Sequence, residues 1–262
     1  MTQRVLMAED IAINRRIQQA QLEPMGVEVV PVLNGTQALE ACRKGEIDLA
    51  MLDLVMPGMD GFAACQALRA DEATARLPIL ILTALAGDAK SRSLTAGADD
   101  FLRKPANSLL LQRRVTNLLE LGAFERGWKG PLPAPRGEVW VVSPAAHVRA
   151  MVVAQVRESG GGREFESLEG LLPLLASESP AMVALDWALG PASLRDFAMR
   201  MQSSPALSCT PMLLLHPQAG LPIIEANPPV VDDFLELPFQ AADLKQRVGL
   251  ILRLSRARRA SL

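Results

Sequence analysis

Aromatic residues are scarce in this 262-residue sequence, which has no tyrosine, seven phenylalanines and three tryptophans. Hydrophobic residues nevertheless make up 49% of the chain, so alanine, leucine, valine and methionine must fill its core. The length is comfortable for two domains of about 100–150 residues each. We therefore expect a two-domain globular protein with aliphatic cores.

An excess of charge of one sign is also lacking. The formal net charge is −2, so no global field attracts nucleic acid or an anionic membrane, and DNA is not expected as a partner. Near the C-terminus four arginines cluster, at positions 253, 256, 258 and 259. This cluster is either a solvated helix end, where cations favour the helix dipole, or a binding tail or the start of a linker.

Long apolar runs and an N-terminal signal segment are absent too. No apolar run approaches the 18 or so residues of a membrane span, so we expect a cytoplasmic protein with no membrane partner. The three cysteines, Cys42, Cys65 and Cys209, are widely spaced and lack a metal-binding pattern. We expect free thiols, buried where Cys42 and Cys65 fall on amphipathic helices.

Residues 1–121 alternate five times between a short apolar run and a segment with helical periodicity. The runs expected to form strands are 4–8, 27–32, 49–52, 78–82 and 100–102. The segments expected to form helices are 13–25, 35–44, 61–70, 88–96 and 108–121. Short apolar strands alternating with helices predict an α/β fold with a parallel five-stranded sheet buried on both faces. Pro31 predicts that the second strand lies at an edge or ends early.

Residues 122–137 interrupt this pattern with three prolines and four glycines, which predicts a linker. After it the pattern restarts in register, which predicts a second domain over residues 138–262. The segment around Asp53 (LAMLDLVMP) aligns with that around Asp186 (MVALDWALG), and DDFLRKP (99–105) aligns with DDFLELP (232–238). Both alignments keep one spacing of 133 residues, so we infer that the chain contains two copies of one domain.

Polar side chains follow the expected strands of the first copy. Glu9 and Asp10 follow the first strand, Asp53 the third, and Lys104 the fifth, while Thr83 ends the fourth. The carboxyl ends of parallel strands meet at one edge of a sheet, so these residues converge. Crowded carboxylates favour a hard cation such as Mg²⁺. The ammonium and the hydroxyl complement a phosphoryl group on a carboxylate nucleophile, Asp53.

These residues, with MPGMDG (56–61) after Asp53 and FLRKP (101–105) around Lys104, make residues 1–121 resemble the receiver domains of bacterial two-component response regulators. The resemblance implies the CheY-like, flavodoxin-like (βα)5 doubly wound fold. It also implies that Asp53 accepts phosphate from a histidine kinase or a histidine phosphotransfer protein. Mg²⁺ is then held by Glu9, Asp10, Asp53 and the backbone carbonyl of Val55, and Thr83 and Phe101 are the switch residues.

The second copy lacks most of this chemistry. Glu9 aligns with Ser143, Asp10 with Pro144, Thr83 with His216 and Lys104 with Leu237, and only Asp186 remains. We therefore expect a degenerate receiver-like domain, a pseudo-receiver, that is not phosphorylated. Asp186 is expected to be a structural cap, and His216 a surface or strand-end histidine.

The function expected from these observations is a phosphorylation switch with no output catalytic domain in this chain. Phosphate on Asp53 is expected to alter contacts with an output protein that the sequence does not name, or dimerisation. The alternative is the regulatory N-terminal half of a larger output enzyme, because tandem receiver and pseudo-receiver domains resemble that part of diguanylate cyclases of the PleD type.

Overall fold

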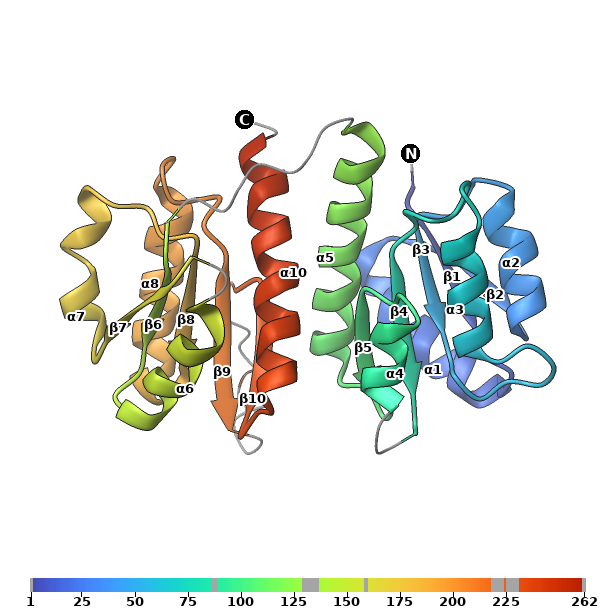
Figure 1. Cartoon of the computed structure of the whole chain (residues 1–262), viewed down its shortest axis with the longest axis horizontal. Helices are drawn as coiled ribbons and strands as arrows, with labels where there is room; N and C mark the ends of the chain where they lie inside the picture. Colours follow the sequence, from blue (N-terminus) through green and yellow to red (C-terminus); the bar gives the residue numbers. More distant parts are fainter. Residues whose placement is uncertain are drawn as a thin grey trace. The chain divides into compact units, whose positions relative to one another are not determined.

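The computed structural model describes residues 2–85, 89–128, 137–157, 160–217, 224 and 231–260. The chain divides into two compact units, Met1–Lys129 and Gly130–Leu262 (Figure 1). The division falls within the segment expected to be a linker, of which residues 129–136 lie outside the described residues. No helix in the described parts of the chain is long and apolar enough to cross a membrane.

The first unit is built on a parallel sheet of five strands in the order β2-β1-β3-β4-β5. The strands are β1 (Arg4–Ala8), β2 (Glu28–Val32), β3 (Leu49–Leu52), β4 (Ile79–Thr83) and β5 (Asp100–Arg103). Every residue of β3 and β4 is buried, as expected for strands covered on both faces. Pro31 lies inside β2, which is an edge strand, so the first of the two alternatives holds.

Helices cover both faces of this sheet (Figure 1). They are α1 (Ala12–Leu22), α2 (Gly35–Arg43), α3 (Gly61–Ala70), α4 (Ala89–Thr95) and α5 (Ser108–Gly127), with a 3-10 turn, η1 (Glu23–Met25), after α1. Helix α1 packs against α5, and α2 packs against α3. Side chains cap three of the helices: Asn34, Asp60 and Asn107 accept hydrogen bonds from backbone N–H groups in the first turns of α2, α3 and α5.

Helix α5 corrects the predicted start of the linker. It continues to Gly127, so residues 122–127, assigned to the linker from their glycines, are helical. All three prolines of the segment lie further on, between residues 131 and 135. Gly122 has a packing role, because a Cβ atom at this position would lie 2.5 Å from Cγ of Pro78. The glycine lets α5 approach the start of β4 closely.

The cores are aliphatic, as the composition predicts. That of the first unit is dominated by alanine, leucine and isoleucine from β1, β3, β4 and the helices. Cys42 and Cys65 are free and buried, as predicted. Burial raises the pKa of the Cys42 thiol to about 12 and that of Cys65 to about 11, so both stay protonated and unreactive at neutral pH.

The second unit repeats the architecture. Its parallel strands run in the order β7-β6-β8-β9-β10, which is the order of the first unit. The strands are β6 (Val139–Val142), β7 (Gly162–Phe165), β8 (Met182–Asp186), β9 (Met212–Pro217) and β10 (Asp233–Leu237). The helices are α6 (Ala146–Val156), α7 (Leu168–Leu171), α8 (Pro191–Ser203) and α10 (Ala241–Ala260), with 3-10 turns η3 (Leu174–Ala176) and η4 (Trp187–Leu189). The predicted fold class, two α/β units with parallel five-stranded sheets, is confirmed.

Both units fix the start of the fourth strand with an aspartate. Asp99 Oδ2 accepts a hydrogen bond of 2.9 Å from the backbone N–H of Ile79, and Asp232 Oδ2 accepts one of 2.7 Å from that of Met212. The arginine that neutralises each aspartate differs. Arg69 on α3 pairs with Asp99 at 2.7 Å, whereas Arg258 on α10 pairs with Asp232 at 2.5 Å. This contact places Arg258, from the C-terminal arginine cluster, in the fold of its own unit.

Replacement of Arg69 by methionine is expected to lower the free energy of unfolding of the first unit by about 2–4 kcal/mol. Arg69 also donates to the carbonyls of Gly97 and Leu77 at 2.7 and 2.6 Å, and these acceptors would lose their donor. Urea unfolding followed by circular dichroism measures the change. The control is Arg43→Met, because the Arg43–Asp71 pair is exposed and its loss is expected to cost much less stability. Equal losses in the two variants would contradict this account of Arg69.

Candidate functional site

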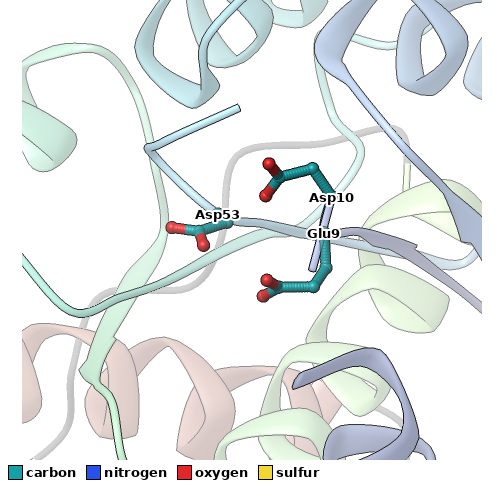
Figure 2. Close-up of side chains that lie close together, drawn as sticks. All are labelled: Glu9, Asp10 and Asp53. Carbon is teal, nitrogen blue, oxygen red and sulfur yellow. The ribbon is translucent and has the colours of Figure 1, made fainter. Parts of the chain in front are cut away.

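Three carboxylates meet at the carboxyl ends of β1 and β3 (Figure 2). Glu9 and Asp10 directly follow β1, and Asp53 directly follows β3. The backbone N–H of Asp53 donates to the carbonyl of Ala8 at 3.0 Å, which holds the two strand ends side by side. Each of the three residues offers a carboxylate oxygen, and these oxygens all lie within 4.8 Å of one another. The convergence predicted from the sequence is therefore present.

Lys104 brings one positive charge to this cluster. Its backbone N–H donates to the carbonyl of Thr83 at 2.9 Å, which places it beside the end of β4. Its Nζ donates to Oε2 of Glu9, and to Oδ2 of Asp53 at 2.5 Å. The Lys104 side chain is only 12% exposed, so these ion pairs are poorly screened by water. Three carboxylates still face one ammonium, and this imbalance favours a cation.

The donor set fits a hard divalent cation. In Asp53, Oδ1 accepts from the backbone N–H of Val55 at 3.2 Å and Oδ2 accepts from Lys104. The Asp10 carboxylate has no hydrogen-bond donor among the described residues, and it is more exposed than Glu9. Mg²⁺ takes one or two carboxylates and completes its shell with waters. Asp10 and Asp53 offer two such carboxylates, next to Glu9.

Thr83 and Phe101 lie on the neighbouring strands β4 and β5. Thr83 is the last residue of β4 and is fully buried. Its Oγ1 accepts from the backbone N–H of Leu85 at 3.3 Å. Phe101 is 8% exposed and belongs to the apolar core of the unit. The hydroxyl therefore stands at the same sheet edge as Lys104, while the aromatic ring is packed inward.

The loop between Asp53 and α3 is shaped by glycines. Gly58 has a φ of +76°, a conformation that glycine adopts without strain. A Cβ atom on Gly61 would lie 2.1 Å from the carbonyl oxygen of Asp53. Only glycine at this position lets the start of α3 pass directly behind Asp53. The MPGMDG segment thus fixes the backbone that presents the Asp53 carboxylate.

Three residues of α1 that contact the acidic pair were missed by the sequence reasoning. Asn14 Nδ2 donates to Oε1 of Glu9 at 2.9 Å, and Gln18 Nε2 donates to Oε2 at 3.1 Å. Arg15 donates to the backbone carbonyls of Glu9 and Asp10 at 2.7 and 2.8 Å. The signal available in the sequence was a pair of amide side chains spaced four residues apart, Asn14 and Gln18, of which the first lies four residues after Asp10.

The corresponding edge of the second unit is arranged differently. Ser143 Oγ donates to Oδ2 of Asp186 at 2.5 Å, and the backbone N–H of Ala188 donates to Oδ1 at 2.9 Å. Asp186 is therefore the N-cap of η4, as predicted. Leu237 occupies the position of the lysine. Both oxygens of the one remaining carboxylate are engaged by its own unit.

His216 is a strand-end histidine, which is one of the two alternatives expected from the sequence. The other alternative, a surface position, is wrong, because the residue is only 1% exposed. Strand β9 lies between β8 and β10, and the ring meets Phe234 edge-on at 6.3 Å between ring centroids. Nδ1 lies 3.1 Å from the carbonyl oxygen of Pro217. Burial lowers the pKa of His216, and the Pro217 carbonyl and the charge of Glu236 partly offset this shift.

This lowered pKa predicts that the second unit loses stability as the pH falls below 6.5. In that range His216 takes up a proton more readily in the unfolded chain than in the folded chain. The free energy of unfolding therefore falls by at most about 1.4 kcal/mol per pH unit. Urea unfolding between pH 7.5 and 5.5, followed by tryptophan fluorescence, measures this loss of stability, since Trp140 and Trp187 lie in this unit. His216→Gln is expected to flatten the pH dependence, whereas the exposed His147, changed to glutamine, leaves it as in the wild type. An unchanged slope in His216→Gln would refute the assignment.

Comparison with known protein families matches the first unit. The model of the response regulator receiver domain matches residues 5–116. The response regulator PleD of Caulobacter vibrioides is 38% identical over 119 residues, which cover 45% of this chain and 26% of PleD. The sensor protein GacS of Pseudomonas syringae is 43% identical over 116 residues, which cover 43% of this chain and 13% of GacS. The chain spans less than half the length of the curated relatives it matches.

Solved structures of receiver domains and response regulators are also similar to the first unit. A putative response regulator from Chloroflexus aurantiacus is 33% identical, with 45% of this chain and 98% of that chain covered and a TM-score of 0.44. The receiver domain of a sensor histidine kinase from Pseudomonas aeruginosa is 34% identical, with the same coverage and a TM-score of 0.43. That structure has a magnesium ion coordinated in its active-site cleft.

Proposed function

Because residues 5–116 form a response regulator receiver domain, we propose that this chain is a two-component response regulator phosphorylated on Asp53. The observation that carries the proposal is the contact of Lys104 Nζ with both Asp53 and Glu9 at the edge where Asp10 and Thr83 also lie. This edge combines a carboxylate nucleophile, a fixed ammonium, a hydroxyl and two further carboxylates. Together they suit the transfer of a phosphoryl group to a carboxylate.

In the proposed reaction, a carboxylate oxygen of Asp53 attacks the phosphorus of a phosphohistidine or of acetyl phosphate. The bond from phosphorus to the donor breaks, and the donor leaves with the bonding electron pair. Lys104 moves from its carboxylate partners to an oxygen of the phosphoryl group, and the Thr83 hydroxyl donates to another. Glu9, Asp10, Asp53 and the carbonyl of Val55 are the groups that would hold Mg²⁺, which would supply positive charge beside the phosphoryl oxygens.

We assign the switch to Thr83 and Phe101. Thr83 is buried at the end of β4, and Phe101 is packed in the core on the adjacent strand β5. Reorientation of the Thr83 hydroxyl towards the phosphoryl group would free space beside β5, and Phe101, which has no hydroxyl, would respond only through packing. The change would reach the surface formed by α4, β5 and α5, and alter partner contacts or dimerisation.

The second unit is a pseudo-receiver in this proposal. Its Asp186 has Ser143 and Pro144 in place of the acidic pair, and Leu237 cannot neutralise a phosphoryl group. A unit that keeps the fold without the site is retained for contacts, with the first unit's output partner or with a second copy of the chain. Its role is therefore structural or regulatory.

Incubation with acetyl phosphate and Mg²⁺ tests this assignment. The wild type is expected to incorporate one phosphoryl group, Asp53→Asn none, and Asp186→Asn as much as the wild type. Intact-protein mass spectrometry measures incorporation, and light scattering on the same samples reports dimerisation. Incorporation by Asp53→Asn, or equal loss in both variants, would overturn the proposal.

A surface beside the site supports a protein as the phosphodonor. Ile11, which follows Asp10, is 50% exposed, and Ile13 and Ile17 on α1 are 60% and 52% exposed. Three exposed isoleucines next to the carboxylate cluster form an apolar patch of the kind that binds a partner. We assign this patch to the histidine kinase or histidine phosphotransfer protein, whose phosphohistidine must reach Asp53.

The double substitution Ile13→Glu/Ile17→Glu is expected to slow phosphorylation by a protein donor at least tenfold, because it places charge on an apolar contact surface. The donor is a phosphorylated histidine phosphotransfer protein that transfers to the wild type, and loss of its label is followed with time. Incorporation from acetyl phosphate, which needs no docking, is expected to stay at the wild-type rate. Unchanged transfer from the protein donor would reject the patch as its docking site.

A second candidate is the regulatory part of a larger output enzyme, such as a diguanylate cyclase. The observation that favours it is the similarity to PleD, of which this chain spans 26%. Phosphorylation of Asp53 would then control a catalytic domain through the second unit.

A further inference from the structure

We propose that Asn14 and Gln18 are positioning residues of the acidic site: they hold the buried Glu9 carboxylate in the place where it serves Lys104 and the cation. The inference rests on the proposed function, because it gives Glu9 a role in a phosphorylation site. Neither amide touches the phosphoacceptor, so both act through Glu9.

The Glu9 carboxylate needs such partners because it is fully buried. Its side chain is 1% exposed, and a buried carboxylate without hydrogen-bond donors is costly. It receives three: Asn14 at Oε1, Gln18 at Oε2, and Lys104 at Oε2. Gln18 is itself 6% exposed. The two amides therefore replace the water that would otherwise surround this charge.

The amides become essential when Lys104 changes partners. In the proposed reaction the ammonium leaves the carboxylates for a phosphoryl oxygen, and Glu9 then loses one of its three donors. Asn14 and Gln18 remain in place, so the carboxylate keeps its position and its hydrogen bonds. Without them Glu9 would depend on Lys104 alone, and the ammonium would be drawn back from the phosphoryl group.

The second unit provides an internal comparison. Helix α6 corresponds to α1 at a spacing of 134 residues, so Ser143 stands for Glu9, Val148 for Asn14 and Val152 for Gln18. Both valines are buried in the apolar core. The carboxylate and both amides have thus been replaced together, although the fold is the same. The amides serve the carboxylate and not the helix.

Arg15 shows the opposite pattern. Its counterpart Arg149 is retained, and it donates to the carbonyl of Ser143 at 2.6 Å as Arg15 donates to that of Glu9 at 2.7 Å. A residue that binds the backbone is kept in both units, since both need the turn after the first strand. Residues that bind the Glu9 side chain are kept only where that side chain exists.

Mg²⁺ binding to the full chain tests the inference, measured by isothermal titration calorimetry with Mg²⁺ alone. Gln18→Met is expected to weaken Mg²⁺ binding about tenfold, which is the typical effect of removing a residue that hydrogen-bonds to a metal ligand. In a Glu9→Gln background the same change is expected to have less than a twofold effect, because there is no carboxylate to hold. Gln19→Met, on the same helix and not among the donors to Glu9, is the matched control. Equal weakening in both backgrounds, or none in either, would overturn the inference, as would an effect of Gln19→Met equal to that of Gln18→Met.

Urea unfolding supplies a readout that does not depend on the metal. Asn14→Val/Gln18→Val is expected to lower the midpoint, because it leaves a buried carboxylate with one donor. Adding Glu9→Ser, which recreates the combination of the second unit, is expected to raise the midpoint again. A further fall on adding Glu9→Ser would contradict the role assigned to the amides.

These outcomes separate the inference from the proposed function. Phosphate incorporation by the wild type from acetyl phosphate tests the function alone. Incorporation without coupling between Gln18 and Glu9 would reject the positioning role and leave the function intact. If the unfolding midpoints show coupling but no phosphate is incorporated, the proposed function is rejected. The amides would then stabilise Glu9 without serving a phosphorylation site.

Discussion

The first unit depends on one electrostatic constraint: carboxylates must share a sheet edge without separating the strands that carry them. Lys104 meets that constraint by reaching back to Glu9 and Asp53 from the end of β5. The parallel register places all of these groups on one edge, where water cannot screen them well. A single ammonium leaves the cluster rich in negative charge, so the edge is prepared for a cation.

The two units together distinguish what the fold needs from what the chemistry needs. Both retain the aspartate that fixes the start of the fourth strand, and both retain a buried aspartate–arginine pair, Asp100–Arg114 in one and Asp233–Arg247 in the other. The acidic pair, the hydroxyl, the lysine and the amides of α1 occur in the first unit alone. Their joint replacement by Ser143, Pro144, His216, Leu237 and two valines indicates that these residues serve one purpose.

Helix α1 connects two aspects of that purpose. Its amides reach the buried Glu9 carboxylate, while Ile13 and Ile17 are exposed. Arg15 ties the helix to the backbone of the acidic pair. A partner that binds the apolar patch would therefore bind a helix already fixed to the acidic site, which keeps the donor and the acceptor in a defined relation.

The sequence by itself determined the strands of the first unit, the presence of two α/β units and the five residues at the strand ends. Apolar runs, helical periodicity and a constant spacing, which carry this information, are local or repetitive signals. It misplaced the end of α5, since the role of Gly122 depends on contact with Pro78. It also missed Asn14 and Gln18 and the burial of His216. These were decided by tertiary structure alone, because whether a polar side chain is buried and which charge it meets depend on segments distant in the chain.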